Sequence, residues 1–541
     1  MNSHTLSQLL FDAAGKSFWL LAAAIPIARQ SGLESRLRFI VDSSRKPGRL
    51  RPAAARAAAL IIGGLFFFVG GCKPEVTPKA GLANGSEALR QKQFEQLKLF
   101  FAEKEKQAQS LASKDGKTLF PEVGSYFAAG KKGDWKTVDG LWTNFFYRRG
   151  PQYERTKDTV DDARLRTPYW QTIIETWGAW ACVDRIAPKY TQLMADGIIR
   201  SIPAGSIYLG GTDPGRFLIS AMCQSQTQGD PFFTVTQNGV ADPTYLDYVR
   251  LMYGEKIQVP PNEAAEKIFS DYAQDVARRY RHDQDFPNEP RQIKPGEIAS
   301  AEDGRFSIGG VAAVMEINAS IIKIMFDKNP DRDFYIEESY PLDWTYPYLE
   351  PHGLIMKINR QPLAELSGQV VDADQKYWRN LVNGMIGDWL TEDTTVKTVA
   401  EFASKVYVRK DLGGFTGDSA FVQNEYAMKT FSKLRSSIAG LYAWRIGALQ
   451  DVPAAEVDTA RAAPDRQRMA AAADFAFRQA FALWPSSPDV VMRYTHFLTA
   501  QNRAGDAILV AETASQMPSL KEEDAARFRG LLEDLKAGRS K

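Results

Sequence analysis

The sequence predicts an α/β domain with a small, mainly parallel sheet, flanked by N-terminal helices and a C-terminal helical-repeat region. Short apolar runs alternate with helical segments between residues 201 and 362, and small and aromatic residues recur at helical spacing further on. The chain has 541 residues, 44% of them hydrophobic and 24% charged, which is enough to build a large core. We expect four segments: an extension with anchor and linker (1–86), a helical region (87–200), the α/β domain (201–362) and a second helical region (363–541).

The overall charge and the cysteines exclude some classes of function. There are 67 basic and 65 acidic residues, so nothing favours nucleic acid as a partner. With four histidines and no CxxC pair, we expect neither a structural zinc site nor another metal or cofactor. If Cys72 is modified, Cys182 and Cys223 remain, either as a disulfide in an oxidising compartment or as two separate buried thiols.

The N-terminal extension predicts an export signal and a membrane anchor. Residues 38–56 contain six basic side chains and one acid, residues 57–71 are apolar and uncharged, and Cys72 follows. The apolar run is shorter than the roughly 20 residues that a bilayer crossing needs. Residues 69–72 (VGGC) resemble a bacterial lipobox, which implies lipidation of Cys72. An uncleaved single span starting near residue 53 is the alternative.

Either anchor would leave the basic flank in the cytoplasm and the body of the protein outside it, in the cell envelope or periplasm. A weaker apolar stretch at 18–27 precedes this signal and suggests that translation starts further downstream. Beyond the anchor, residues 87–113 and 167–199 are expected to be helical, since their apolar residues recur mostly every three or four positions.

The α/β domain is predicted from a unit that occurs twice. The apolar runs 206–210 and 232–236 are each followed by an Asp-Pro pair and a helical segment. Asp213 and Asp242 suit the N-cap position, with proline next as the first helical residue. Such alternation predicts that the two strands pair in parallel.

The rest of this domain is predicted from shorter signals. Residues 255–305 read as a polar insertion with a helix near 262–281, and 310–326 as a helix. The runs 333–337 and 354–358 read as strands on either side of an aromatic loop.

Four polar residues follow the first two strands and form a candidate ligand site: Asp213, Arg216, Asn238 and Asp242. Ligands of open α/β sheets bind at the carboxyl ends of the strands, where helix N-termini attract anions and an arginine adds a bidentate grip. A sugar, phosphate or carboxylate would fit. The alternative is that both aspartates only cap helices and Arg216 forms a structural ion pair.

A second group, Glu337, Glu338, Glu350 and His352, flanks the aromatic loop. Paired carboxylates there could do glycosidase-type acid and base catalysis, whereas ordinary charges at strand ends are the simpler interpretation. The sequence shows no nucleophile elbow, P-loop or metal motif, so we assign no catalytic residue.

The C-terminal helices contain the most specific pattern. Ala473, Phe477, Ala480 and Pro485 have the spacing of the second helix of a tetratricopeptide repeat, and a further repeat begins near Pro488. The two alanines should lie at a close helix crossing, with Phe477 in the core.

The helix before this pattern is expected to face a concave surface that binds a protein partner. Ser436, Tyr442 and Arg445 would lie near that surface. The alternative is that the repeats only cover the α/β part and bind nothing.

Three stretches, 202–217, 232–254 and 333–360, are similar to the soluble C-terminal region of certain bacterial membrane proteins. The N-terminal part of those proteins resembles multi-span protein O-mannosyltransferases, and helical repeats often follow their soluble part. The residues that correspond to the motifs of that region are Gly210, Asp213, Tyr348, Leu349, Gly353 and Leu354. The similarity covers 196–360 and the repeats, under two-thirds of the chain.

The transferase acids of that family lie between membrane spans that this chain lacks, so no catalytic residue is carried over. The resemblance implies a stand-alone accessory part, and a membrane glycosyltransferase as the partner. We therefore expect a non-enzymatic, membrane-tethered scaffold. The alternatives are a glycan-active enzyme, or a glycan- or peptide-binding module, at the carboxyl edge of the sheet.

Overall fold

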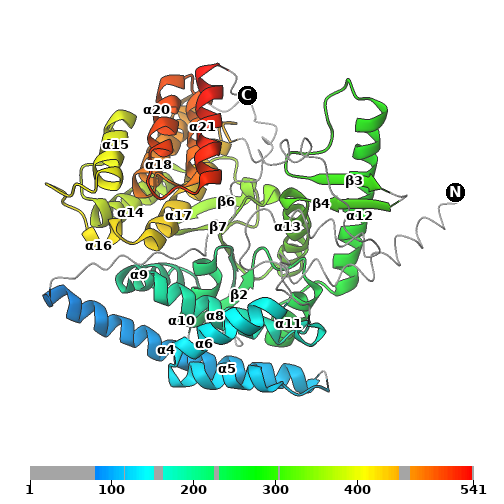
Figure 1. Ribbon diagram of the computed structural model, residues 1–541. Coiled ribbons are helices and arrows are strands. Elements are labelled where there is room, and N and C mark those ends of the chain that lie inside the picture. Colours follow the sequence, from blue (N-terminus) through cyan, green and yellow to red (C-terminus); the bar gives the residue numbers. More distant parts are fainter. Residues whose placement is uncertain are drawn as a thin grey trace. The chain divides into compact units, whose positions relative to one another are not determined.

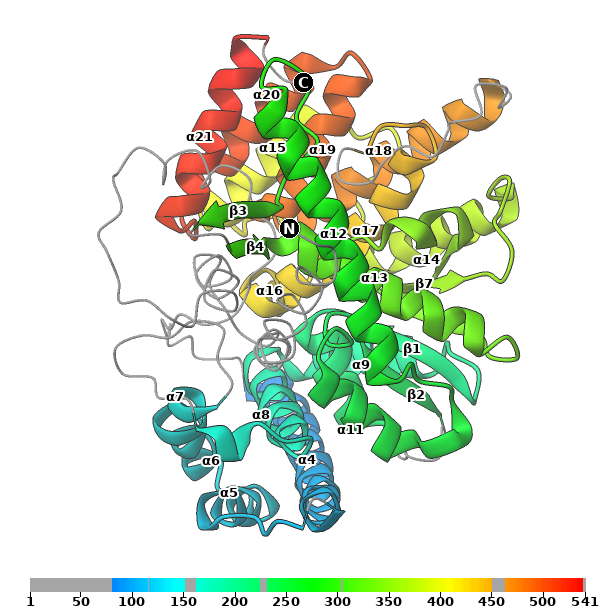
Figure 2. The same ribbon diagram turned by 90° about the vertical axis from the view of Figure 1, so that its right-hand side faces the viewer.

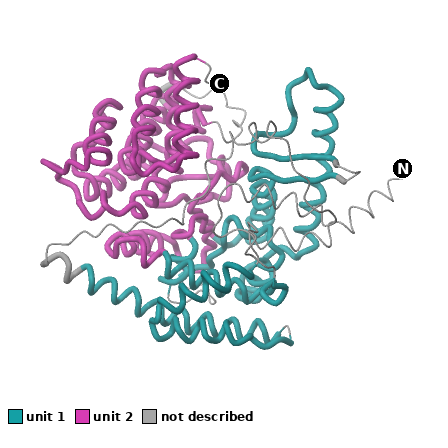
Figure 3. Tube along the Cα trace, viewed as in Figure 1, with its two compact units in different colours: residues 1–62, 66–181, 216–332 teal, residues 63–65, 182–215, 333–541 magenta. Residues whose placement is uncertain are grey.

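The computed structural model describes residues 80–114, 116–150, 162–223, 231–302, 305–449 and 463–538. The described chain is mostly helical, with a small mixed sheet and a separate two-stranded hairpin (Figure 1). It divides into two compact units (Figure 3). Unit 1 takes in the described residues of Phe66–Ala181 and Arg216–Arg332, and unit 2 those of Cys182–Gly215 and Asp333–Lys541. The predicted signal and Cys72 lie outside the described residues.

The helices before the first strand are α4 (Ala80–Lys114), α5 (Pro121–Lys132), α6 (Trp135–Leu141), η1 (Trp142–Phe146), α7 (Tyr147–Arg149), η2 (Ala163–Leu165), α8 (Trp170–Arg185) and α9 (Pro188–Ile199). The elements from the first strand to the hairpin and its following helix are β1 (Ser206–Gly210), η3 (Pro214–Leu218), α10 (Ile219–Met222), β2 (Phe232–Thr236), α11 (Pro243–Tyr253), η4 (Gly254–Lys256), α12 (Asn262–Asp285), β3 (Ile298–Glu302), β4 (Arg305–Gly309) and α13 (Val311–Lys328).

The remaining strands and their connection are β5 (Phe334–Glu337), η5 (Asp343–Tyr348), β6 (Leu349–His352) and β7 (Ile355–Ile358). The C-terminal helices are α14 (Gly368–Ile386), α15 (Val396–Ala403), η6 (Ser404–Val408), α16 (Ser419–Val422), α17 (Glu425–Trp444), α18 (Ala463–Leu483), α19 (Pro488–Ala500), α20 (Ala504–Ser515) and α21 (Glu522–Lys536).

The larger sheet has the strand order β2-β1-β5-β7-β6. β1 pairs with β5 in parallel, but β5 and β6 both pair with β7 in antiparallel fashion, so the expectation of a mainly parallel sheet was wrong. For the β6–β7 pair, the reason is the length of the connection. A parallel crossover needs a dozen or more residues, usually a helix, whereas β6 and β7 are joined by two residues. One of them, Gly353, has a φ of 64°, which suits glycine in this tight turn.

The strands β1 and β2 have the predicted bounds, and all their residues are buried. A parallel direction for this pair stays a prediction. The strand β6 was missed because Pro351 interrupts its pattern. Proline is tolerated at the edge of a sheet, and β6 stands at the end of the strand order.

In unit 1, the predicted insertion has a structure of its own. The helix α12 packs against α13 and against the antiparallel β3–β4 hairpin (Figure 2). Phe306 on β4 contacts Tyr280 on α12 with ring centroids 5.6 Å apart. The contact joins the hairpin to α12, which is needed because an isolated two-stranded hairpin is only marginally stable.

Unit 2 contains a compact helical bundle. Ala473, Phe477 and Ala480 on α18 are fully buried, as predicted, and the ring of Phe477 stacks on Tyr494 at 5.4 Å. The Ser432 hydroxyl on α17 donates to the Ala480 carbonyl at 2.7 Å, so the two helices cross closely. However, α18 contacts α14, α15, α17 and α19, whereas a repeat in a solenoid touches only its neighbours. Tetratricopeptide-like repeats therefore stay a prediction.

The predicted concave surface is covered by the protein itself. Ser436, Tyr442 and Arg445 are at most 2% exposed. The Arg445 guanidinium donates to the Leu363 carbonyl at 2.7 Å, and α17 packs against β6 and β7. This face of α17 holds unit 2 together, so the expectation that it is open to a partner was wrong.

Candidate functional site

The carboxyl end of β1 is closed by a glutamate from the neighbouring strand β5. Glu337 Oε2 accepts hydrogen bonds from the backbone N–H groups of Gly211 at 2.8 Å and Thr212 at 2.7 Å. Successive N–H groups in such a turn are a common binding place for anions. The protein's own carboxyl group therefore occupies part of the place that we expected to receive a ligand.

The same turn leaves no room for a side chain at Gly215. A Cβ there would lie 1.9 Å from Glu337 Oε2. The Gly215 carbonyl accepts from the Tyr208 hydroxyl at 2.8 Å, and its N–H donates to Thr212 Oγ1 at 3.1 Å. The side-chain cap seen at this turn thus comes from Thr212, while the Asp213 side chain is half-buried beside it.

Glu337 sits in a poorly solvated environment. The residue is 1% exposed, and its Oε1 has no hydrogen-bond partner among the described residues. Burial raises the pKa of the Glu337 carboxyl, against the opposing effect of the Thr212 and Gly211 amides and the more distant Lys433 charge. The neutral form is therefore favoured relative to an exposed glutamate.

The adjacent Glu338, directly after β5, belongs to a charged cluster with side chains of α17 and α19. Its Oε2 accepts from the Tyr346 hydroxyl at 3.0 Å, and its Oε1 lies 3.5 Å from Arg493 Nη1. Arg493 also contacts Asp489 at 3.3 Å, and Asp489 pairs with Lys433 at 3.0 Å.

Within this cluster, the acids Glu338 and Asp489 contact the bases Arg493 and Lys433. The arrangement ties the end of β5 to the helical bundle of unit 2.

Two of the four predicted ligand residues meet in unit 1. Arg216 Nη1 donates to Asn238 Oδ1 at 3.1 Å, and the guanidinium lies over the Phe217 ring, 4.2 Å from its centroid. Arg216 is 4% exposed, so this contact is internal. Asp213 falls in the other compact unit.

Asp242 has the predicted role of N-cap. Its Oδ1 accepts from the Thr244 N–H at 2.7 Å, and Pro243 is the first residue of α11. Burial raises the pKa of Asp242 to about 8, although hydrogen bonds from the amides of Tyr245 and Thr244 oppose the shift. Asp242 therefore caps α11, and Arg216 and Asn238 contact each other inside unit 1. A ligand site formed by the four residues stays a prediction.

The acids around the aromatic loop do not gather into one pair. Glu350 lies opposite Lys357 in the β6–β7 ladder, so β7 separates it from Glu337 on β5. His352 Nε2 lies 2.8 Å from the Ser201 carbonyl oxygen, and its ring packs against Tyr335 at 5.0 Å. A glycosidase-type carboxylate pair finds no support in this arrangement.

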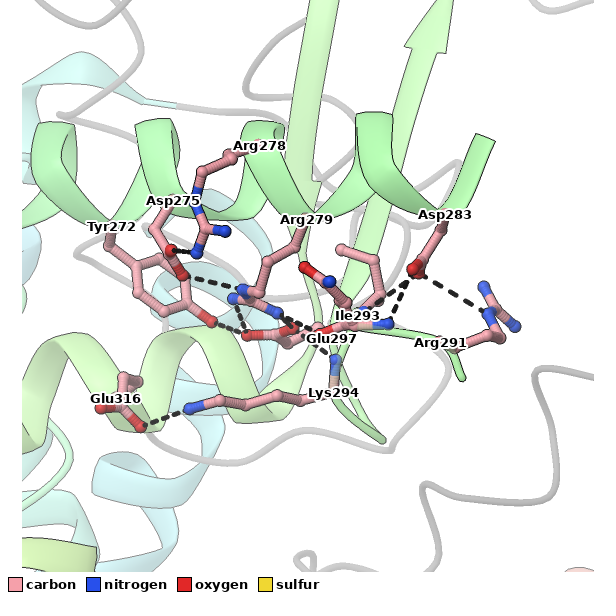
Figure 4. A network of polar contacts seen from close by, with 11 residues as sticks. Tyr272, Asp275, Arg278, Arg279, Asp283, Arg291, Ile293, Lys294, Glu297 and Glu316 are labelled. Atoms are coloured by element: carbon pink, nitrogen blue, oxygen red, sulfur yellow. Dashed lines mark hydrogen bonds and ion pairs between the residues drawn. The ribbon is translucent and has the colours of Figure 1, made fainter. Parts of the chain in front are cut away.

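A polar network that the sequence did not reveal joins α12 to the chain before β3 (Figure 4). The Glu297 carboxylate accepts from Arg279 Nη2 at 2.8 Å, from the Lys294 N–H at 2.7 Å and from the Tyr272 hydroxyl. Burial opposes ionisation, yet the bonds from Arg279, Tyr272 and Lys294 hold the pKa of Glu297 below its ordinary value.

One helical turn away in the same network, Asp283 accepts from the amides of Gln292 and Ile293 at 2.7 and 3.1 Å. These two contacts fasten the loop after α12. Arg279 could not be singled out in the sequence because it stands in a helix rich in charges, most of them exposed.

A second missed group lies among α4, α8 and α11 in unit 1. The fully buried Lys104 ammonium contacts Glu175 at 2.5 Å and donates to the Tyr248 hydroxyl oxygen at 2.8 Å. That hydroxyl donates to Glu175 at 2.8 Å, and burial raises the pKa of Tyr248 well above its usual value. Each member of the triad contacts the other two, and the triad links elements far apart in the sequence.

Some expectations concern metals, membranes and thiols. Across the described ranges, no group of three or more His, Cys, Asp or Glu side chains is placed to hold a metal ion. None of the described helices combines the length and apolar composition that a membrane crossing needs. Cys182 and Cys223 are buried and not joined in a disulfide, which agrees with two separate thiols.

No family model, no curated protein and no solved structure matches this chain. The resemblance drawn from the sequence motifs therefore stays a prediction.

Proposed function

We propose that this protein is a non-enzymatic scaffold of the cell envelope, tethered to the membrane by lipid on Cys72. The observation that carries the proposal is the closure of the β1 carboxyl end by Glu337. Where an α/β domain would bind a small ligand, two of the available amides are held by an internal carboxyl group. Asp242 caps α11, and Arg216 and Asn238 contact each other, which argues against chemistry at this edge.

As part of this proposal, we place the binding surface for a protein partner on the outer face of α21. Only Phe528 and Leu535 of this helix are buried, and charged residues such as Arg529 and Glu533 are exposed. The inner helices are less suitable as a partner surface, since α18 is surrounded by other helices and α17 packs on β6 and β7. The terminal helix of a helical array has a polar outer face, as α21 does.

Affinity capture from detergent-solubilised membranes tests the scaffold role. The full chain is compared with R529E/E533R, which swaps two charges on α21 without changing the net charge. The matched control, K267E/D271K, swaps an exposed pair on α12. We expect the α21 swap alone to reduce recovery of a partner. Equal recovery with both variants would contradict the role of α21, and no protein above the no-bait background would contradict the scaffold. A membrane glycosyltransferase is the first partner to look for, given the resemblance described above.

Mass spectrometry of the mature N-terminus tests the tether. The expected result is a diacylglyceryl-modified Cys72 as the first residue, and C72S should move the protein out of the membrane fraction. An unmodified Cys72 inside a longer intact peptide would instead support the single-span anchor.

A further inference from the structure

A buried polar node joins three helices of unit 2. Asp374 on α14, Arg435 and Tyr442 on α17, and Gln479 on α18 are all at most 4% exposed. Asp374 Oδ2 accepts from Arg435 Nη1 and from the Tyr442 hydroxyl, each at 2.8 Å. Arg435 Nε donates to Gln479 Oε1 at 2.8 Å. The guanidinium thus joins the other two helices to α17.

Three atoms of this node have no hydrogen-bond partner among the described residues: Arg435 Nη2, Gln479 Nε2 and Asp374 Oδ1. Because arginine can only donate, the atom of Gln479 that faces Nε must be the oxygen, so the amide NH₂ remains as a donor. Both bonded groups contact the same guanidinium, and their remaining atoms are therefore close to it. Leaving buried donors and acceptors without partners is unfavourable.

We propose that the node is a binding site for one internal water molecule. The water would accept from Arg435 Nη2 and Gln479 Nε2 and donate to Asp374 Oδ1. Three such bonds are typical for a buried water. A cation would be unfavourable there because it would face the two donors, Arg435 Nη2 and Gln479 Nε2. An anion would be unfavourable because it would face the Asp374 carboxylate, which already balances the charge of Arg435. Water is the small ligand that both donates and accepts.

The node also explains why polar side chains stand in the middle of a helical bundle. Around it lie fully buried apolar groups, and the Arg435 guanidinium lies 5.1 Å from the centre of the Trp378 ring. A hydrated arginine can satisfy its donors there without reaching the surface. The water would therefore act as a structural ligand at the meeting point of α14, α17 and α18.

A crystal structure of the unmodified protein tests the proposal directly. We expect a solvent peak within hydrogen-bond distance of all three atoms. A map without this peak, or one in which Arg435 Nη2 bonds directly to Asp374 Oδ1, would overturn the proposal.

Two variants then test the assignment of Gln479 as a water partner. Q479M removes one of the three atoms, whereas Y442F removes a bond to Asp374 Oδ2 but none of the three. The solvent peak should weaken in Q479M and persist in Y442F. Equal peaks in the two variants would refute a bond between the water and Gln479.

Discussion

Glu297 in unit 1 and Glu337 in unit 2 are both buried, yet the pKa of the first is lowered and that of the second is raised. The cation decides the difference. Glu297 contacts the Arg279 guanidinium and two further donors, whereas Glu337 contacts backbone amides and leaves one oxygen without a partner. Burial alone therefore does not predict whether the pKa of a carboxyl group is raised or lowered, but its direct partners do.

Removing the cation from Glu297 should have the largest effect. R279M leaves a buried carboxylate without its charge partner, which destabilises a protein by about 3–5 kcal/mol. The neighbouring R278M is the control, because the Arg278 side chain is 67% exposed and its ion pair is worth at most about 1 kcal/mol. Hydrogen exchange of residues 286–297, followed in urea, measures both. Similar protection in the two variants would contradict the structural role of Arg279.

Neutralising Glu297 should have a smaller effect that depends on pH. E297Q loses charge-assisted bonds worth roughly 1.5–3 kcal/mol at neutral pH. Since the folded-state pKa lies below the ordinary 4.5, the stabilisation by the carboxylate is present above that value. It disappears as the pH falls through the lowered pKa. Unfolding of E297Q and wild type should therefore converge in acid, and a constant difference across pH would refute the assignment.

Adding a side chain next to the Glu337 carboxyl group should also destabilise the protein. G215A places a Cβ against Glu337 Oε2, and such overpacking typically costs about 1–3 kcal/mol. In the double variant with E337A the clash is gone, so the two effects should not add. G530A is the control, because a Cβ there meets nothing within 4 Å and should stabilise α21 by about 0.5–1 kcal/mol. Additive effects of G215A and E337A would contradict the contact.

The smallest effect is expected for E337Q. Glutamine keeps one acceptor oxygen for the two amides, so the change at neutral pH should stay below about 1 kcal/mol. Because the folded-state pKa is raised, the carboxyl group stabilises the fold fully below its unfolded pKa and loses that contribution as the pH rises through the folded value. Wild type should thus lose stability relative to E337Q on going from acid to neutral pH. The opposite slope would show that Glu337 is held as a carboxylate.

Local patterns in the sequence predicted local structure well. The spacing of Ala473, Phe477 and Ala480 predicted their burial, and Asp242-Pro243 predicted the start of α11. Such features depend on the nearest turn of the chain, which is visible in the sequence.

Tertiary partners could not be predicted in the same way. Arg445 was predicted to lie near a binding surface, because the sequence around it does not indicate that it donates to the Leu363 carbonyl. Glu337 was singled out as a possible acid, but its bonds to amides 125 and 126 residues earlier in the chain could not be foreseen. The short connection between β6 and β7 makes that pair antiparallel, which the Asp-Pro units after β1 and β2 could not indicate.

Because the two units are interleaved along the chain, strands that pair in the folded protein are synthesised at different times. Ile207 on β1 pairs with Phe334 on β5, 127 residues later, and the whole second segment of unit 1, Arg216–Arg332, lies between them in the sequence. At 5–20 residues per second, a ribosome needs roughly 6–25 seconds to supply the partner strand. Until then, β1 has to wait for its partner β5 in the nascent protein. Export before folding would remove this wait from the cytoplasm altogether.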